Sequence, residues 1–570
     1  MQKIVLDGKN LTIEQVSAVA FSFAPISIAP TALEAVEKSF QFIQTKVAEN
    51  AIIYGVTTGF GSNVDKFISQ ETALALQVNL IRSHATGVGA PFDTAIVRAI
   101  MLIRLNTLLQ GLSGVQTATI RLLEHFLNLQ IHPVIPSQGS VGASGDLCPL
   151  AHMALALIGE GDAEHKGRVA PSSEWLQKHA LQALQPLHKE GLALLNGTTV
   201  MNAIAALACF RAEKLFKLAT MQTAMAAEAL CARKQAFDKK IHEVRRHEGQ
   251  LTVAHLIQDY TEGSHFLGIA PLQIWQSASS LFSHFSPEEK EDITHHLSKS
   301  LKIAENLIDS TPNELSTAEY LRKRTCLRFI NKKLIPQDAY SIRCAPQVIG
   351  ASWQALIHIK QIISQELNAV VDNPIIFIEE DEILSGGNFH GQPLALAADY
   401  LKIALAEVGN LLERQTNKLL DPATNDYLPA MLIENAGLHS GLMIPQYAAA
   451  ALVSENKVLA HPASVDSIPT CANQEDHVSM GTIACRQAYE ILHNVEKIVA
   501  IALMTSTQAM DIRQKQLTDW GFTFLEWGKK TSAMRQTIRQ LVSFLEEDRF
   551  LKKDIDQLLN HWQSLVEGCE

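Results

Sequence analysis

Residues 201–232 read MNAIAALACFRAEKLFKLATMQTAMAAEALCA, and this stretch predicts the fold more clearly than any other part of the sequence. Alanine is the best helix former, and its small side chain lets neighbouring helices approach closely. Apolar residues would lie on nearly every side of such a helix, which is typical of a helix inside a bundle. The stretch therefore predicts a long helix that is buried among others.

Helical periodicity also appears on either side of this stretch. Apolar residues recur at steps of three and four positions between Val97 and Leu112, and again between Leu401 and Leu412. Strand signals are sparse, and the best candidate is a short hairpin of Ile375–Glu380 followed by Glu382–Leu384. The residue pattern alone predicts a largely helical chain.

The composition is that of an ordinary globular protein. Of 570 residues, 47% are hydrophobic and 19% are charged, which excludes wholesale disorder, a collagen-like repeat and a coiled-coil rod. The formal net charge is −11, so electrostatics give no reason to expect binding to nucleic acid or to an anionic membrane. No apolar run is long enough to predict a membrane span. Small-molecule chemistry is the default expectation, and the length predicts two or three packed lobes.

Cysteine spacing and familiar motifs narrow the kind of site further. The eight cysteines are scattered and form no C-x-x-C pair, which is typical of reduced thiols in the cytoplasm. The apolar segment Val16–Ala29 follows several charged residues and is interpreted as buried chain rather than as a signal peptide. No nucleotide-binding glycine motif is present. His242 and His247 are spaced too widely for one helical face, so no metal site is predicted.

The most informative loop is GSVGASGDL at residues 139–147. In the simplest interpretation it is a flexible turn that leads into a helix, with Asp146 as the N-cap. The triplet Ala143-Ser144-Gly145 permits another interpretation. If the nitrogen of Gly145 reaches the carbonyl carbon of Ala143, the backbone can close a five-membered ring, because glycine has no Cβ in the way. Loss of the Ser144 hydroxyl as water would then leave an exocyclic methylene, which is an electrophile built from the chain.

Long motifs occur in order along the chain. They are YGVTTGFG (54–61), NLIRSHATGVG (79–89), GSVGASGDLCPLAH (139–152), EGLALLNGT (190–198), QDAYSIRCAPQV (337–348), GGNFHGQP (386–393) and HPASVDSIPTCANQEDHVSMG (461–481). With these motifs the chain resembles the aromatic amino-acid lyase and aminomutase family from about Ile4 to about Ile555. The resemblance is greatest to the histidine ammonia-lyases of the family, and it implies elimination of ammonia from L-histidine to give trans-urocanate.

The resemblance implies a prosthetic group that the chain makes itself. Members of the family carry 4-methylideneimidazol-5-one (MIO), which the triplet 143–145 would supply here, without pyridoxal phosphate and without a metal. Asp146 would assist the dehydration that forms the ring, and Phe389 would pack beside it and help to drive ring closure. Tyr54 would be the base at the β-carbon of the substrate. Because an unperturbed tyrosine has a pKa of about 10, we expect neighbouring donors and helix ends to lower the pKa of Tyr54.

The same resemblance implies which residues surround the substrate. Arg343 would clamp the α-carboxylate with its planar guanidinium group. Asn196, Gln337 and Tyr340 would line the MIO and stabilise its developing oxyanion. Without the resemblance, each of these residues would be interpreted as a helix cap, a loop polar group or a surface charge.

Two further positions bear on the identity of the substrate. His84 and Glu475 match residues that face the imidazole in histidine ammonia-lyases. Glu475 stands where phenylalanine- and tyrosine-directed relatives usually have glutamine, whereas His84 is shared with some tyrosine-directed members. Thr57, where many histidine enzymes carry asparagine, and the long segment before Gln337 depart from the histidine pattern. A tyrosine or phenylalanine ammonia-lyase, a 2,3-aminomutase of the same family and a non-enzymatic paralogue stay open as alternatives.

The resemblance also implies an architecture. It is all-α, of the fumarase and aspartase type, with a long central helix bundle and a smaller N-terminal lobe that carries the MIO. We expect the lobe over residues 1–195, the bundle over 196–510 with a helical insertion at 264–335, and a C-terminal helical segment over 511–570. The family forms homotetramers whose active sites combine residues from different subunits. We therefore expect a cytoplasmic homotetramer with an amino-acid substrate and no nucleic-acid or membrane partner.

Overall fold

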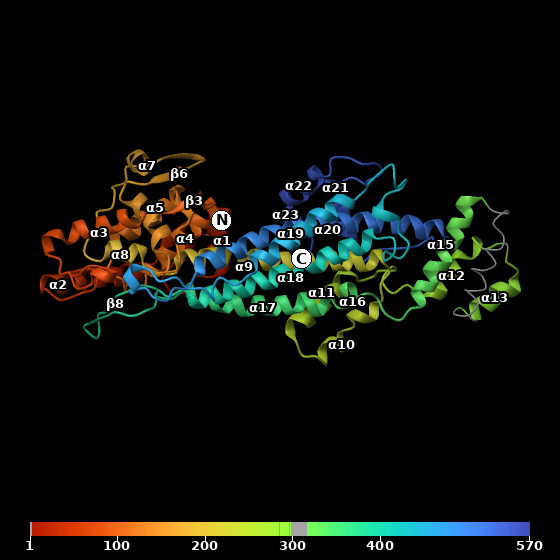
Figure 1. Ribbon diagram of the computed structural model, residues 1–570, viewed down its shortest axis with the longest axis horizontal. Coiled ribbons are helices and arrows are strands. Elements are labelled where there is room, and N and C mark those ends of the chain that lie inside the picture. Colours follow the sequence, from red (N-terminus) through yellow and green to blue (C-terminus); the bar gives the residue numbers. More distant parts are fainter. Residues whose placement is uncertain (1–2, 284, 296, 298–315) are drawn as a thin grey trace. The chain divides into compact units, whose positions relative to one another are not determined.

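Helices make up most of the computed structural model, which describes residues 3–283, 285–295, 297 and 316–570 (Figure 1). The all-α fold class is therefore confirmed. The chain divides into two compact units, each built from three stretches. Unit 1 consists of residues 1–211, 356–403 and 459–490, and unit 2 of residues 212–355, 404–458 and 491–570. The lobe boundaries expected at residues 195 and 510 stay predictions.

The N-terminal part of unit 1 is a group of helices packed around α4. These helices are α1 (Ile13–Ser22), α2 (Pro30–Ala48), α3 (Gln70–His84), α4 (Thr94–Leu108), α5 (Thr117–Leu129), α6 (Leu147–Leu157), α7 (Ser172–Lys178) and α8 (Glu190–Leu195). Both α1 and α5 pack against α4, whose side chains from Ile96 to Leu108 are all buried. The period predicted up to Leu112 ends early: α4 stops at Leu108, and Gly111 then takes a left-handed conformation that a helix does not have.

Short strands join the helices of unit 1. They are β1 (Ile4–Leu6), β2 (Ile26–Ile28), β3 (Val88–Pro91), β4 (Ile131–Pro133), β5 (Pro136–Gln138), β6 (Asp162–His165), β7 (Arg168–Pro171), β8 (Ile375–Phe377) and β9 (Glu382–Leu384). β1 and β2 are parallel, whereas β3 with β5 and the sheet β4–β6–β7 are antiparallel. The predicted hairpin is confirmed by β8 and β9, which pair with Ile376 opposite Ile383.

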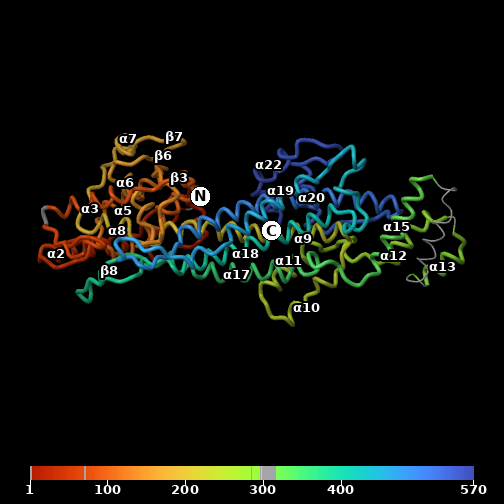
Figure 2. The backbone as a smooth tube through the Cα atoms, in the orientation of Figure 1, coloured from red at the N-terminus to blue at the C-terminus, as the bar shows by residue number. Residues whose placement is uncertain are grey.

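Four long helices form the rest of the scaffold, and two of them carry the alanine-rich stretch and the period that begins at Leu401. They are α9 (Thr199–Ala229), α17 (Ala345–Glu366), α18 (Gln392–Leu420) and α20 (Gly481–Asp519). The first confirms the long helix predicted from residues 201–232, and the third contains the period that begins at Leu401. Within unit 2, Thr223 of α9 bonds Gln415 of α18 and Gln222 of α9 bonds Ser506 of α20, so these helices lie side by side (Figure 2).

The remaining described helices are shorter. They are α10 (Lys239–Glu243), α11 (Glu248–Tyr260), α12 (Pro271–Ser277), α13 (Pro287–His295), α15 (Thr317–Leu334), α16 (Tyr340–Arg343), α19 (Met443–Leu459), α21 (Lys529–Leu541), α22 (Lys552–Asn560) and α23 (Trp562–Glu567). Three of them, α12, α13 and α15, lie in the region 264–335, of which residues 284, 296 and 298–315 are outside the described part. The ring of Trp275 stacks on that of Phe282 at 5.1 Å, and α12 packs against α15. Among the described helices, none is both long and apolar enough to cross a membrane.

Candidate active site

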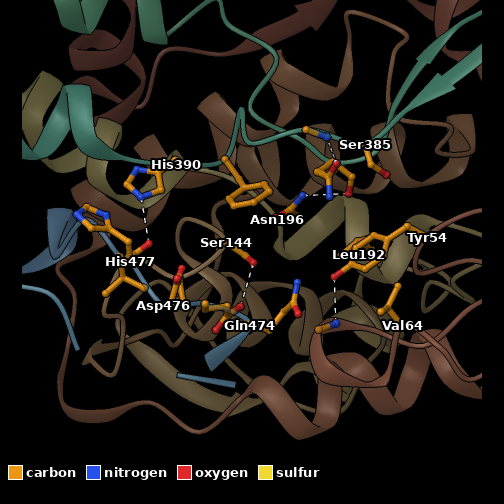
Figure 3. A pocket seen from close by; sticks show the side chains of 18 residues that line it. Tyr54, Val64, Ser144, Leu192, Asn196, Ser385, His390, Gln474, Asp476 and His477 are labelled. Carbon is orange, nitrogen blue, oxygen red and sulfur yellow. Dashed lines mark hydrogen bonds between the residues drawn. The ribbon is translucent and has the colours of Figure 1, made fainter. Parts of the chain in front are cut away.

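A cavity of about 360 Å³ in unit 1 gathers half of the site residues that the sequence singled out (Figure 3). Its lining includes Tyr54, Ala143, Ser144, Asn196, Phe389 and Glu475. A second cavity of about 550 Å³ shares Tyr54, Ser144 and Glu475 with the first and adds His84. The two cavities therefore meet at Tyr54, Ser144 and Glu475, which makes this junction the candidate active site.

The loop that carries the predicted electrophile is held tightly against the segment after α8. Ser144 has a φ of +49° and Gly145 a φ of +82°, both in the left-handed region. The Gly197 N–H donates to the Ser144 carbonyl oxygen at 3.0 Å, and a Cβ on Gly145 would meet the Gly197 carbonyl carbon and oxygen at 2.3 Å. Only glycine can occupy position 145 without moving this backbone. The triplet thus has the small residues and the tight turn that ring closure needs.

Asp146 is fully buried, and its carboxylate accepts hydrogen bonds from the N-terminus of α9 rather than from that of α6. It occupies the N-cap position of α6 but makes no side-chain bond to that helix. Instead it accepts the backbone N–H groups of Val200 and Met201 in the first turn of α9, at 2.8 and 2.9 Å, and the Thr482 hydroxyl at 2.6 Å. Asp146 is thus the N-cap residue of α6, as predicted, but its carboxylate caps the first turn of α9 instead. Burial raises the pKa of Asp146 to about 6, despite these hydrogen bonds.

Tyr54 is half-buried, and its hydroxyl oxygen accepts the Gly61 N–H at 3.1 Å. Burial raises the pKa of Tyr54 above its ordinary value, and the nearby charge of Glu475 raises it further. The Gly61 N–H lowers that pKa but does not cancel the rise. The prediction that neighbouring donors and helix ends lower this pKa is therefore wrong for the residues of unit 1.

Glu475 lies between the loop 139–147, which carries the predicted electrophile, and a turn formed by residues 471–473. One carboxylate oxygen accepts the Ser144 hydroxyl at 3.3 Å, and the other accepts the Thr470 hydroxyl at 2.7 Å. Cys471, Ala472 and Asn473 all have φ between 50° and 67°, which turns the chain back so that Thr470 reaches Glu475. Sequence reasoning missed Thr470, because nothing in its neighbourhood signals three successive left-handed residues.

His84 is the last residue of α3 and lines the second cavity. The hydrogen bonds of one of its ring nitrogens indicate where the proton lies. Its Nδ1 lies 2.9 Å from the Leu80 carbonyl oxygen and 3.0 Å from the Ser83 hydroxyl. A carbonyl oxygen can only accept, so Nδ1 carries the proton in this bond. In the neutral ring Nε2 is then an acceptor.

Asn196 and Phe389 both line the first cavity, as expected for residues beside the MIO. Asn196 is only 2% exposed, and its side-chain amide donates to the Asp372 carboxylate at 3.2 Å and to the Asn373 carbonyl oxygen at 3.1 Å. Phe389 is half-buried, and the next residue, His390, bonds the His477 carbonyl oxygen at 3.3 Å. Their predicted roles stay predictions, but the structure brings both to the electrophile loop.

The structure places Gln337, Tyr340 and Arg343 in unit 2, where they line a cavity of about 530 Å³. The Arg343 Nε donates to the Asp338 carbonyl oxygen at 3.0 Å, and the guanidinium lies 4.5 Å from the centre of the Tyr340 ring. Tyr340 is 72% exposed. None of these three residues lines the cavities of unit 1.

Comparison with known proteins places most of the chain in one family. A family model described as aromatic amino acid lyase matches residues 11–540. The chain is 42% identical over 560 residues to a histidine ammonia-lyase from Alkaliphilus oremlandii, covering 98% of this chain and 96% of the relative. Among solved structures it resembles a histidine ammonia-lyase from Trypanosoma cruzi, with a TM-score of 0.81, 33% identity and coverage of 100% and 95%. A tyrosine aminomutase from Streptomyces globisporus is also similar, with a TM-score of 0.83, 34% identity and coverage of 100% and 97%.

Proposed function

This chain belongs to the aromatic amino acid lyase family, and on that premise we propose that it eliminates ammonia from L-histidine to give trans-urocanate. It is a carbon–nitrogen lyase, and relatives named histidine ammonia-lyases that align along nearly the whole chain support histidine as its substrate. One structural observation carries the choice of substrate. The carboxylate of Glu475 lies where the two cavities meet, beside Ser144.

The triplet 143–145 fits the MIO group that the family uses. Ser144 and Gly145 form a left-handed turn, and Gly145 lies in a position that any Cβ would fill. The Ser140 hydroxyl donates to the Gly145 carbonyl oxygen at 3.3 Å. The group supplies an electrophile for the amino group of the substrate, which makes ammonia a better leaving group. No pyridoxal phosphate and no metal enter this proposal.

Tyr54 takes the proton from the β-carbon. Tyr54 and Ser144 both line the two cavities, so a substrate held at Ser144 would lie in the space that Tyr54 borders. Only the phenolate form can accept the proton. Because the pKa of Tyr54 is raised, this form is scarce at neutral pH and becomes more abundant as the pH rises. Turnover is therefore expected to increase toward alkaline pH.

Glu475 and His84 recognise the imidazole ring of the substrate. An imidazole offers an N–H that a carboxylate can accept, and Glu475 presents such a carboxylate. His84 lines the same cavity, and the neutral form of its ring would offer Nε2 as a second acceptor. A phenyl ring has no N–H, so it would cover the partly buried carboxylate without adding a donor to the one that Thr470 supplies. The site should reject phenylalanine more strongly than shape alone requires.

Glu475→Gln is expected to lower kcat/KM for L-histidine by roughly 10- to 150-fold, the value of one hydrogen bond to a charged group. The same change should weaken the discrimination against L-phenylalanine, because the charge that a phenyl ring would cover is gone. Asp466→Asn is the matched control, since it removes one exposed carboxylate outside both cavities. Steady-state kinetics with both amino acids measure the effect. Equal histidine kinetics in Glu475→Gln and in the control would remove the structural reason for assigning histidine.

Gln337, Tyr340 and Arg343 complete the site from a neighbouring subunit of a homotetramer. The exposure of Tyr340 and the position of all three residues in unit 2 support this arrangement. Arg343 would hold the substrate carboxylate with its planar group, and the hydroxyl of Tyr340 would lie near the electrophile. A cytoplasmic location fits the scattered free cysteines.

A further inference from the structure

Arg104 of α4 is fully buried and bonds the segment that follows α8. Its Nη1 donates to the Asn196 carbonyl oxygen at 2.8 Å, and its Nη2 donates to the Ala193 carbonyl oxygen. A Cβ on Gly197 would lie 2.9 Å from the Arg104 Nη1, so the guanidinium can approach this closely only because residue 197 is glycine. Burial lowers the pKa of Arg104 from its ordinary value, yet an arginine keeps its charge in proteins. A positive charge therefore lies against the peptide group that joins residues 196 and 197.

The same peptide group connects Arg104 to the loop that carries the predicted electrophile. Its carbonyl end accepts the hydrogen bond from Arg104, and its other end, the Gly197 N–H, donates to the Ser144 carbonyl oxygen at 3.0 Å. The two hydrogen bonds thus run in one direction, from the guanidinium through the peptide group to the Ser144 carbonyl. Hydrogen bonds in such a chain polarise one another, and a charged donor at its start is stronger than a neutral one. The Gly197 N–H is therefore a stronger donor to Ser144 than an ordinary peptide N–H.

The buried charges beside this peptide group leave an excess of positive charge. Lys189 and Asp372 are both fully buried, and the Lys189 Nζ lies 2.5 Å from the Asp372 Oδ2. Burial alone would raise the pKa of Asp372, but the charges of Lys189 and Arg104 lower it below its ordinary value, so the carboxylate is ionised. Arg104 bonds two carbonyl oxygens rather than a carboxylate. Two cations thus share one anion, and the field of the unbalanced charge acts on the peptide group and on the Ser144 carbonyl beyond it.

We propose that Arg104 is a positioning residue for the maturation of the loop 139–147: through the peptide group 196–197 it withdraws electron density from the Ser144 carbonyl and so promotes the loss of water from Ser144. In this step a proton leaves the Ser144 Cα and the hydroxyl leaves the Cβ, and together they depart as one molecule of water. The electron pair of the Cα–H bond becomes the double bond between Cα and Cβ, and nothing is oxidised or reduced.

The position of the donor fits the place where charge develops. As the proton leaves the Ser144 Cα, negative charge gathers on the adjacent carbonyl oxygen, which is the atom that accepts the Gly197 N–H. A donor that is already aimed at this oxygen stabilises the charge without reorganisation. The inference rests on the proposed function, because it concerns the electrophile that this function needs.

The test follows the mass of the intact full-length chain at intervals during cell-free synthesis, which gives the rate at which the chain loses its two molecules of water. Arg104→Gln removes the charge and leaves Lys189 and Asp372 as a balanced pair, so no unpaired charge is buried. We expect this variant to lose the two waters roughly tenfold more slowly than the unmodified chain, the value of the charge in one hydrogen bond.

Arg98 supplies the matched control, because it is a second buried arginine of the same helix. It donates to the carbonyl oxygens of Val19 and Leu127, at 2.8 and 3.0 Å, and not to the segment beside the loop. Arg98→Gln should lose both waters at the rate of the unmodified chain. Thermal unfolding verifies that both variants fold, and Arg104→Met with Arg98→Met, which fill the space with apolar atoms, replace the pair where glutamine is not tolerated.

Arg104→Lys separates the charge of the side chain from its shape. Lysine keeps a positive charge and a donor for the Asn196 carbonyl oxygen but lacks the planar fork of arginine. We expect this variant to lose the two waters at least about threefold faster than Arg104→Gln. A side chain that only filled space would give no such recovery.

Two outcomes in the variants would overturn the inference. Equal rates of water loss in Arg104→Gln and Arg98→Gln would show that Arg104 does not act on the loop. Equal rates in Arg104→Gln and Arg104→Lys would show that the charge has no part in the reaction. Failure of the proposed function is seen separately, in the unmodified chain: if this chain keeps its full sequence mass, it makes no electrophile, and the proposed function and the inference both fail.

Discussion

Ser144→Ala is expected to abolish ammonia release, lowering kcat by on the order of 10³-fold or more, while the fold is kept. The alanine can neither lose water nor form the exocyclic methylene. The Ser144 hydroxyl makes only one hydrogen bond in the described structure, a 3.3 Å contact to Glu475, so its loss should cost little stability. Ammonia release and thermal unfolding are the two measurements.

The mass of the intact protein tests the same electrophile without an activity assay. The unmodified chain should be lighter than its sequence mass by two molecules of water, one lost on ring closure and one from Ser144. Ser140→Ala is the control, because Ser140 supports the same loop but loses no atom in the reaction. The Ser140→Ala protein should therefore still be lighter than its own sequence mass by two molecules of water. A native mass equal to the sequence mass, together with full activity in Ser144→Ala, would exclude the chain-derived electrophile.

Tyr54→Phe is expected to lower kcat by about 10²- to 10⁴-fold, the usual contribution of a positioned general base. The residual activity should no longer rise with pH, because the rise reflects ionisation of a phenol whose pKa is raised by burial. Phenylalanine keeps the ring that packs edge-on against Phe60 at 6.4 Å, so stability should hardly change. The pH profile of kcat/KM is the deciding measurement.

The exposed Tyr447 supplies the control for this variant. Tyr447→Phe removes a phenol from outside the cavities and should leave both the rate and its pH dependence unchanged. An unchanged alkaline rise in Tyr54→Phe would mean that another group titrates and accepts the β-proton. Either His84 or Glu475, which line the second cavity with Tyr54, would then be the next candidate.

Secondary structure could be predicted from the sequence where one preference, such as helix propensity, dominates a whole stretch. The alanine-rich residues 201–232 form α9 because the same helical preference repeats over many positions. The hairpin at 375–384 was also correct, because its two short strands flank a turn at Asp381. Local composition suffices for such elements.

The chemistry of single side chains in the site was less predictable. Asp146 stands just before α6 in the sequence, yet the fold brings the N-terminus of α9 to its carboxylate. Asp372 and Lys189 are 183 positions apart and meet only in the folded core. The pKa of Tyr54 moves in the direction opposite to the one expected, because burial outweighs the Gly61 N–H. Each of these depends on distances that only the folded chain determines.

The central claim is that this chain releases ammonia from L-histidine in preference to other aromatic amino acids. Incubating the purified protein with an equimolar mixture of L-histidine, L-tyrosine and L-phenylalanine tests it most directly, with all products quantified by mass spectrometry. We expect trans-urocanate and free ammonia in equal amounts, with little product from the other two substrates. A β-amino acid formed without free ammonia, or an unsaturated acid derived mainly from tyrosine or phenylalanine, would contradict the account.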